Sequence, residues 1–225
     1  MKSKHITINI SESESVSAVF SVPDRFESGV AVIVAHGAGN DMDNPLLVYF
    51  CEHLAQAGYL AVRFNFPYKE HGRKAPDRQP LLENTWQHVL HFVTEQSGYT
   101  LRKVFVAGKS MGGRVASEML AKGRLTADGI IFLGYPLHPA GNKEKIRDAH
   151  LYKISCPMLF FEGTRDTLCD LDILKVILDH LGNRAQLEVI EGGDHSFKIP
   201  KISTLTIQDV YEKIAARSIN WICEI

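Results

Sequence analysis

The stretch VFVAGKSMGGR, from Val104 to Arg114, supports two incompatible kinds of site. Gly108–Ser110 matches the end of the phosphate-binding motif GxxxxGK[ST], whereas Gly108–Gly112 matches GxSxG, which presents a nucleophilic serine. The phosphate loop needs a glycine five positions before Gly108, where this chain has Lys103. That lysine and the four residues after it have the pattern of a strand, so no room is left for a loop that wraps phosphates. The sequence therefore favours a strand, a sharp turn at the serine and then a helix.

The same alternation of strand and helix runs along most of the chain. Continuous apolar runs such as Val30–Ala35 and Pro157–Phe161 are typical of strands buried on both faces. Segments with helical spacing, such as Leu46–Ala57 and Ile207–Ile222, lie between and after them. We also expect strands at 60–66, 103–107, 129–133 and 185–190, helices at 81–94, 113–121 and 172–181, and an antiparallel hairpin from 4–10 and 16–22. This order predicts a mostly parallel sheet with helices on both faces and ligands at the carboxyl ends of its strands.

Composition limits the classes of protein that need to be considered. The 225 residues, of which 45% are hydrophobic, predict one domain over 1–225. A net charge of −1 gives no reason to expect nucleic acid or an anionic membrane surface as a partner. No apolar run approaches the roughly 18 residues of a membrane span, and Met1–His5 do not begin an export signal. With four scattered cysteines, we expect a reduced, cytoplasmic protein.

A serine nucleophile requires a base to remove its proton and an acid to orient that base. His195 follows the apolar run Leu187–Ile190, and Asp166 follows the strand that ends at Phe161. Both positions lie at the carboxyl ends of expected parallel strands, on the same sheet edge as Ser110. We therefore expect Ser110, His195 and Asp166 to form the catalytic triad.

Other acids compete with Asp166 for the orienting role. Asp170 and Asp172 are placed to begin the next helix, and Asp194 is the immediate neighbour of the base. Asp166 is preferred because it lies nearest to the end of the strand. The competing interpretation is that Asp166 is an ordinary turn or capping residue and His195 a polar loop residue.

The segment AHGAGN, at positions 35–40, supplies candidates for the oxyanion hole. The backbone N–H of Met111, at the start of the helix after Ser110, is the first expected donor. The second is expected from Ala38 or Gly37, in the loop after the buried third strand. His36 is expected to be a structural hydrogen-bonding residue.

With these residues assembled, the chain resembles the α/β-hydrolase superfamily, and most closely its small, nearly lidless branch related to dienelactone hydrolases. The motifs that carry this resemblance are HGAGND (36–41), RFNFPY (63–68), GKSMGGR (108–114), LGYPLHP (133–139), FFEGTRDTLCD (160–170) and GGDHSF (192–197). Together they are similar to a subgroup of short predicted hydrolases that includes a testis-expressed protein and a non-enzymatic subunit of a chromatin-modifying complex. The resemblance implies eight strands, the second of them antiparallel, and hydrolysis of an ester or related acyl bond. Dienelactone hydrolases proper use cysteine where this chain has Ser110.

The walls of the pocket are less specific in sequence. The short, lid-like insertion at about 135–156 offers Tyr135 and His138 as candidate substrate contacts, with ordinary loop packing as the equal alternative. The basic loop 69–78 offers Arg73, whose guanidinium can hold a carboxylate or phosphate, with a solvated polar loop as the favoured alternative for any single residue. Lys109 has two interpretations: it pairs with a neighbouring acid, or it reaches solvent.

The sequence therefore predicts a serine hydrolase that cleaves a small-molecule carboxylic ester or thioester through an acyl-enzyme on Ser110. Water completes the reaction, so no metal and no organic cofactor are expected. A serine peptidase is less favoured, and transfer of the acyl group to another alcohol uses the same residues. The alternative from another class is a protein-interaction module that keeps this fold without turnover.

Overall fold

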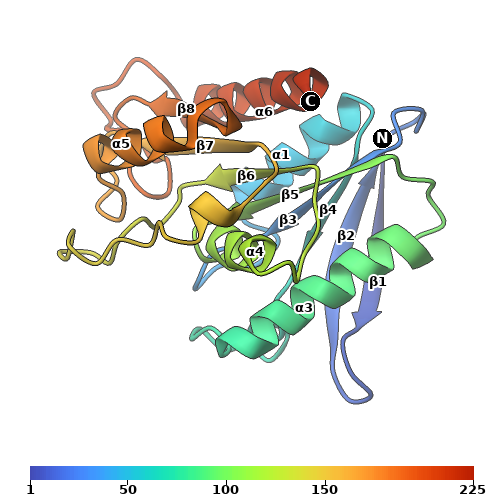
Figure 1. Ribbon diagram of the computed structural model, residues 1–225. Helices are drawn as coiled ribbons and strands as arrows, with labels where there is room; N and C mark the ends of the chain where they lie inside the picture. The colour runs from blue at the N-terminus through green and yellow to red at the C-terminus, as the bar shows by residue number, and fades with distance from the viewer.

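The computed structural model describes residues 1–225 and is organised around one eight-stranded sheet (Figure 1). The strands are β1 (Lys2–Asn9), β2 (Ser15–Val22), β3 (Val30–Ala35), β4 (Leu60–Phe64), β5 (Lys103–Lys109), β6 (Gly129–Leu133), β7 (Met158–Gly163) and β8 (Ala185–Ile190). Their spatial order is β1-β2-β4-β3-β5-β6-β7-β8. β2 pairs antiparallel with both β1 and β4, and the remaining pairs are parallel. This confirms the predicted sheet.

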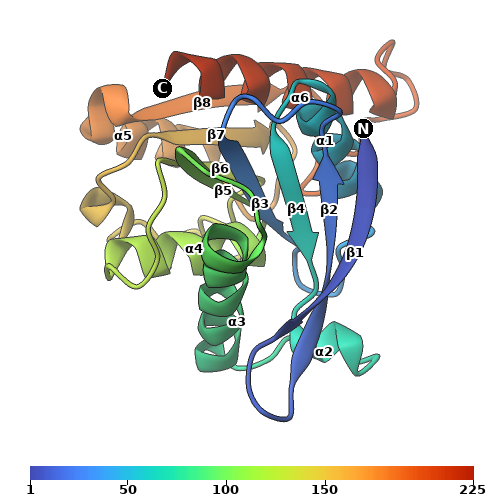
Figure 2. The same cartoon turned by 90° about the vertical axis from the view of Figure 1, so that its right-hand side faces the viewer.

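Helices cover both faces of the sheet (Figure 2). They are α1 (Pro45–Gln56), α2 (Pro67–Glu70), α3 (Gln79–His91), α4 (Met111–Ala121), α5 (Leu171–Leu181) and α6 (Ile207–Glu224). Short turns of π-helix at Phe92–Gln96 and of 3-10 helix at Leu151–Lys153 and Gly182–Arg184 complete the set. Side chains of α1 and α6 pack on one face, and those of α3, α4 and α5 pack on the other. None of these helices has both the length and the apolar character of a membrane span.

Aromatic side chains anchor one helix to each face of the sheet. Trp86 of α3 packs edge-on against Phe64 of β4, with ring centroids 5.0 Å apart. Trp221 of α6 packs against Phe105 of β5 on the opposite face, at 5.8 Å. Edge-to-face pairs of this kind add to the free energy gained by burying the rings themselves. A helix on each face of the sheet is therefore packed firmly against one of the central strands.

The turn after β5 is shorter than the sequence predicts. The strand was expected over 103–107 and the helix from 113, but β5 continues to Lys109 and α4 begins at Met111. Parallel pairing extends β5, because Gly108 is in register with Ala35 of β3 and Lys109 with Leu133 of β6. Ser110 is thus the single residue between strand and helix.

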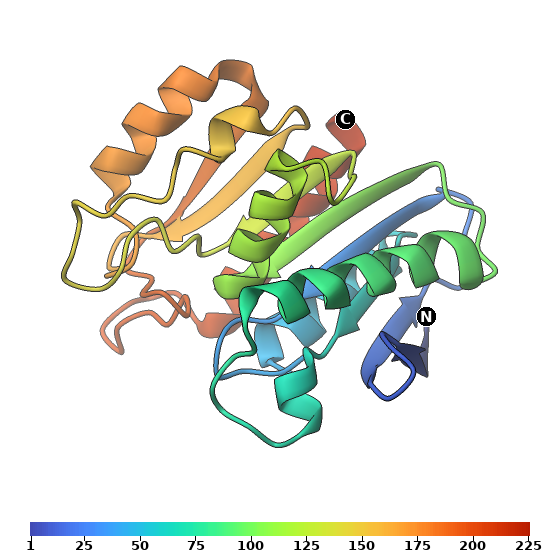
Figure 3. The same ribbon diagram turned by 60° about the horizontal axis from the view of Figure 1, so that its bottom comes forward.

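The segment between β6 and β7 forms no large lid. Its regular structure is limited to the 3-10 turn Leu151–Lys153, and the rest follows an irregular path at one side of the sheet (Figure 3). Arg147 N–H donates to the carbonyl of Leu137 at 2.8 Å and so folds the segment back on itself. The carboxyl ends of the central strands consequently stay accessible.

Candidate active site

Ser110 has a backbone conformation that non-glycine residues rarely adopt. Its φ is 49° and its ψ is −111°, and Phe197 is the only other non-glycine residue with positive φ. A residue in such a region costs on the order of 1–3 kcal/mol, which the surrounding packing must offset. This turn places Ser110 at the carboxyl end of β5 and at the amino end of α4.

Glycines next to Ser110 allow this turn to form. A methyl group on Gly108 would lie 2.1 Å from the backbone nitrogen of Gly113, so β5 and α4 meet without intervening side chains. A methyl group on Gly112 would lie 2.7 Å from the carbonyl oxygens of both Ala35 and His36. The first turn of α4 therefore packs directly against the end of β3 and the loop that follows it.

Ser110, His195 and Asp166 form one hydrogen-bonded chain. His195 Nε2 accepts the Ser110 hydroxyl at 2.8 Å, and His195 Nδ1 donates to Asp166 Oδ2 at 2.6 Å. The Asp166 side chain is fully buried, while 23% of the His195 side chain is exposed. Asp166 Oδ1 accepts the N–H of Leu168 at 2.7 Å, so both carboxylate oxygens have partners.

Close backbone packing sets the position of the His195 loop. A methyl group on Gly163 would lie 2.2 Å from the carbonyl oxygen of Gly193, and that oxygen accepts the N–H of Arg165 at 2.8 Å. Asp194 Oδ1 accepts the N–H groups of Ser196 at 2.8 Å and Lys198 at 2.9 Å, which closes the turn around His195. Asp194 is thus a turn-forming residue.

Asp170 and Asp172, the other acids considered from the sequence, belong to the start of α5. Asp170 Oδ1 accepts the N–H of Asp172 at 3.0 Å and that of Ile173 at 3.3 Å, so it caps the helix. Asp172 is exposed and pairs with Lys175 at 3.5 Å. Neither carboxylate reaches His195.

The expected oxyanion donors lie beside the serine. Met111 is the first residue of α4, so its N–H has no partner within the helix. Ala38, Ser110 and Met111 line one hollow of about 480 Å³. Gly37 is buried below Ala38, and a methyl group on it would lie 3.5 Å from Ser110 Cβ. The geometry brings all four residues together.

His36 and Tyr68 fix the loop that carries Ala38. His36 Nδ1 donates to the carbonyl of Gly37 at 2.9 Å, and its Nε2 accepts the N–H of Phe66 at 3.1 Å. The Tyr68 hydroxyl donates to the same Gly37 carbonyl at 3.2 Å. Burial lowers the pKa of His36 to about 4, so the ring is neutral at physiological pH. His36 is a structural residue, as the sequence predicts.

Two arginines that the sequence did not single out, Arg114 and Arg147, line the hollow. Arg73, the candidate from the sequence, does not line it and instead pairs with the lining residue Asp77 at 2.5 Å. Arg114 follows Ser110 by one helical turn and pairs with Glu118 at 2.5 Å. That helical spacing is a signal for Arg114, whereas Arg147 lies in an irregular segment that gives none.

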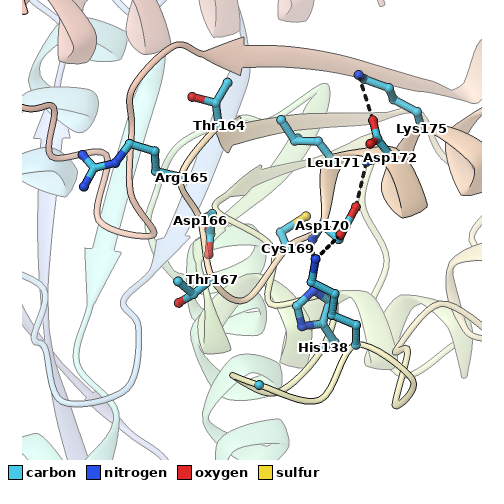
Figure 4. A pocket seen from close by; sticks show the side chains of 12 residues that line it. His138, Thr164, Arg165, Asp166, Thr167, Cys169, Asp170, Leu171, Asp172 and Lys175 are labelled. Carbon is cyan, nitrogen blue, oxygen red and sulfur yellow. Dashed lines mark hydrogen bonds and ion pairs between the residues drawn. The ribbon is translucent and has the colours of Figure 1, made fainter.

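Tyr135 and His138 are not among the residues that line the Ser110 hollow. Tyr135 is buried, and its hydroxyl donates to the carbonyl of Arg147 at 2.5 Å. His138 Nε2 accepts the N–H of Asp170 at 3.0 Å, next to a second hollow of about 610 Å³ that Asp166 also lines (Figure 4). Tyr135 therefore supports Arg147, and His138 lies on the other side of Asp166.

Two buried ionisable side chains lie next to the hydrogen-bonded chain. Lys109 is only 7% exposed and Glu162 is fully buried, so the lysine does not reach solvent. Burial lowers the pKa of Lys109 to about 8 and raises the pKa of Glu162 well above its ordinary value. No group of three His, Cys, Asp or Glu side chains anywhere in the structure is arranged to hold a metal ion.

Comparison with known proteins places this architecture in a family. A model of the alpha/beta hydrolase domain matches residues 28–223. Dienelactone hydrolase from Anabaena variabilis is 19% identical with a TM-score of 0.77, over 99% of this chain and 97% of that one. A lidless serine hydrolase from Xanthomonas campestris is 19% identical with a TM-score of 0.73, over 98% and 95% of the two chains. An esterase from Pyrococcus furiosus is 17% identical with a TM-score of 0.75, over 99% and 90%. The family match over most of the chain, on the fold described above, shows that this protein belongs to the α/β hydrolase family.

Proposed function

We propose that this protein is a serine hydrolase that cleaves a small carboxylic ester or thioester through an acyl-enzyme on Ser110. The observation that carries the proposal is the unbroken chain from Ser110 Oγ through His195 to Asp166, with contacts of 2.8 and 2.6 Å. This is the arrangement by which a serine hydroxyl becomes a nucleophile on many unrelated folds.

In the first half of the proposed reaction, Ser110 Oγ attacks the acyl carbonyl and His195 Nε2 takes its proton. Asp166 holds His195 with Nδ1 protonated, so that Nε2 is free to act as the base, and it stabilises the imidazolium that forms. The backbone N–H groups of Met111 and of Ala38 (or Gly37) stabilise the oxyanion. One such donor is worth about 10²- to 10³-fold in rate.

In the second half, His195 gives its proton to the departing alcohol or thiol, which leaves the acyl group on Ser110. Water then attacks the acyl-enzyme, with His195 Nε2 again as the base. The bond between the acyl group and Ser110 Oγ then breaks, His195 returns its proton to Ser110, and the free acid departs. The protein groups that take part are those of the hydrogen-bonded chain and the two backbone donors, and no cofactor enters these steps.

The hollow around Ser110 supports a small substrate. At about 480 Å³ it lies toward the low end of the sizes typical of small-molecule pockets, and Arg114, Gln79 and Arg147 give it a polar wall. Arg73 acts there through Asp77, and Tyr135 through Arg147, so we propose that both shape the wall without touching substrate. The named activities of the esterase and dienelactone hydrolase relatives agree with an acyl substrate.

Reaction with a fluorophosphonate, which labels an activated serine, tests the proposal without knowledge of the natural substrate. Wild type should be labelled stoichiometrically, Ser110→Ala not at all, and His195→Ala at a severely reduced rate. Ser196→Ala is the matched control, because Ser196 is exposed and adjacent to His195. Labelled wild type would then justify a panel of acyl esters and thioesters.

The contrary outcome also has a definite meaning. If folded wild type resists the fluorophosphonate while its thermal unfolding is normal, Ser110 is not an activated nucleophile and the proposal fails. The fold would then serve binding alone, and protein partners would be sought by affinity capture with the Ser110 face mutated as a control.

A further inference from the structure

Lys109 is the most unusual buried residue outside the proposed triad. It immediately precedes Ser110 at the end of β5, only 7% of its surface is exposed, and its ammonium nitrogen has no hydrogen-bond partner. A buried ammonium in such a place is costly unless charges around it compensate. The surroundings of Lys109 are therefore the place to look for that compensation.

The lysine side chain extends between the loop that contains Gly37 and the loop that carries His195. Its Cγ lies 3.4 Å from the point that a methyl group on Gly37 would occupy, so its stem packs beneath the expected oxyanion loop. Its Nζ lies 5.6 Å from the centroid of the Phe197 ring, in the loop that carries His195. One side chain therefore contacts both loops that flank Ser110.

Gly134 makes room for the ammonium beside His195. This glycine follows β6 with φ of 77°, and a methyl group on it would lie 2.9 Å from Lys109 Nζ. The same methyl group would lie 3.2 Å from the carbonyl oxygen of His195 and 3.7 Å from Cε1 of its ring. Lys109 Nζ and the His195 ring therefore both lie next to Gly134.

Three acidic side chains face Lys109. Glu162 lies at the end of β7, and Asp166 and Asp194 lie in the loops that carry the rest of the site. Glu162 Oε1 accepts the N–H of Tyr135, while its Oε2 has no partner. Burial lowers the pKa of Lys109 to about 8, and these three acids oppose that lowering, so the ammonium is protonated below that pH.

We propose that Lys109 is a positioning residue for the proposed hydrolysis: its buried ammonium, beside the ring of His195, disfavours the imidazolium and so sets the lowest pH at which Ser110 is reactive. The inference rests on the proposed function, because it acts through His195. A cation several ångströms from an imidazole in a poorly solvated site opposes protonation of the ring far more strongly than one in water does. The base thus stays free at a lower pH than it otherwise would.

The rate of fluorophosphonate labelling as a function of pH tests this role. In wild type the rate is expected to fall on the acidic side, where a protonated base cannot accept the serine proton. In Lys109→Met that limb should move by about one unit to higher pH, whereas Lys109→Arg, which keeps the charge, should restore the wild-type limb. Lys198→Met is the matched control, since Lys198 is exposed on the His195 loop and should leave the limb in place.

The possible results separate the two proposals. Wild type that is not labelled at any pH overturns the proposed function and this inference together. If wild type is labelled but the acidic limb of the Lys109→Met profile coincides with that of wild type, the inference alone is overturned. This holds even if the variant reacts more slowly at every pH. Lys109 would then only fill space beneath the site.

A second measurement covers the case in which Lys109→Met does not fold. Lys109→Gln makes the same change of charge with a polar end group. Wild type also gives a direct test, because loss of the Lys109 proton near pH 8 makes His195 a stronger base. Its labelling rate should rise a second time, by about two- to threefold, above that pH and not do so in Lys109→Arg. A flat wild-type plateau would contradict the proposal.

Discussion

The carboxylate of Asp166 lies 2.6 Å from Nδ1 of His195, and its side chain is completely buried although the imidazole is partly open to solvent. The acid is therefore shielded from water, while the base is partly exposed. This arrangement allows Asp166 to hold His195 in the tautomer that carries its proton on Nδ1.

Asp166→Asn tests that relationship. The amide cannot favour the Nδ1-protonated tautomer as a carboxylate does, so the fluorophosphonate labelling rate should fall by about 10³- to 10⁴-fold. Asp170→Asn is the matched control, because asparagine caps a helix about as well as aspartate. It should label at the wild-type rate, and a comparable loss in Asp170→Asn would indicate that the wrong acid has been assigned.

Gly112→Ala should destabilise the protein by about 3 kcal/mol, because the new methyl group would overlap two backbone carbonyl oxygens that have little freedom to move. The added methyl group would lie 2.7 Å from the carbonyl oxygens of Ala35 and His36. The free energy of unfolding in urea measures the effect. Gly39→Ala, at φ of 75° with open space around it, should cost only about 1 kcal/mol of backbone strain. Equal losses in the two variants would contradict the steric explanation.

Acid should weaken the fold partly through His36. Burial lowers its pKa from 6.5 to about 4, so between those values the unfolded chain binds a proton at this position and the folded chain does not. Stability contributed by the neutral ring is thus complete above pH 6.5 and is lost as the pH falls toward 4, by about 3 kcal/mol in total.

Urea unfolding at several pH values in this range measures the loss. His36→Gln should be less stable at neutral pH, since it disturbs the bonds to Gly37 and Phe66, but its stability should fall less steeply with acid. His91→Gln, at an exposed position on α3, is the control and should keep the wild-type slope. A His36→Gln slope equal to that of wild type would show that other groups account for the acid sensitivity.

The sheet could be predicted because nearly every central strand is a continuous apolar run that ends at a glycine or a polar turn. Ser110, Asp166 and His195 were found from their order in the chain and from their positions after successive strands, which is information that one sequence carries. The structure brings those three together. Their functional roles remain predictions that the labelling experiments test.

The surroundings of the site were much harder to predict. Lys109 and Glu162 occupy strand ends where almost every neighbour is buried, so no alternation of polar and apolar residues reveals which side each one faces. Arg147 reaches the hollow from a segment with little regular structure, where no periodicity exists. Such contacts depend on tertiary packing, and single-sequence patterns record mostly local preferences.

The order of the last four strands has a consequence for when Ser110 and His195 come together during folding. β5, β6, β7 and β8 lie side by side in the sequence order, yet Ser110 and His195 are 85 residues apart. Each parallel pairing closes a long loop, and the entropy lost in closing such loops makes non-local pairings slow to form. Under the proposed function, a reactive Ser110 is therefore expected only once these four strands have paired. Labelling of Ser110 during refolding would then report completion of the fold, whereas spectroscopic signals from helices report only the formation of helices.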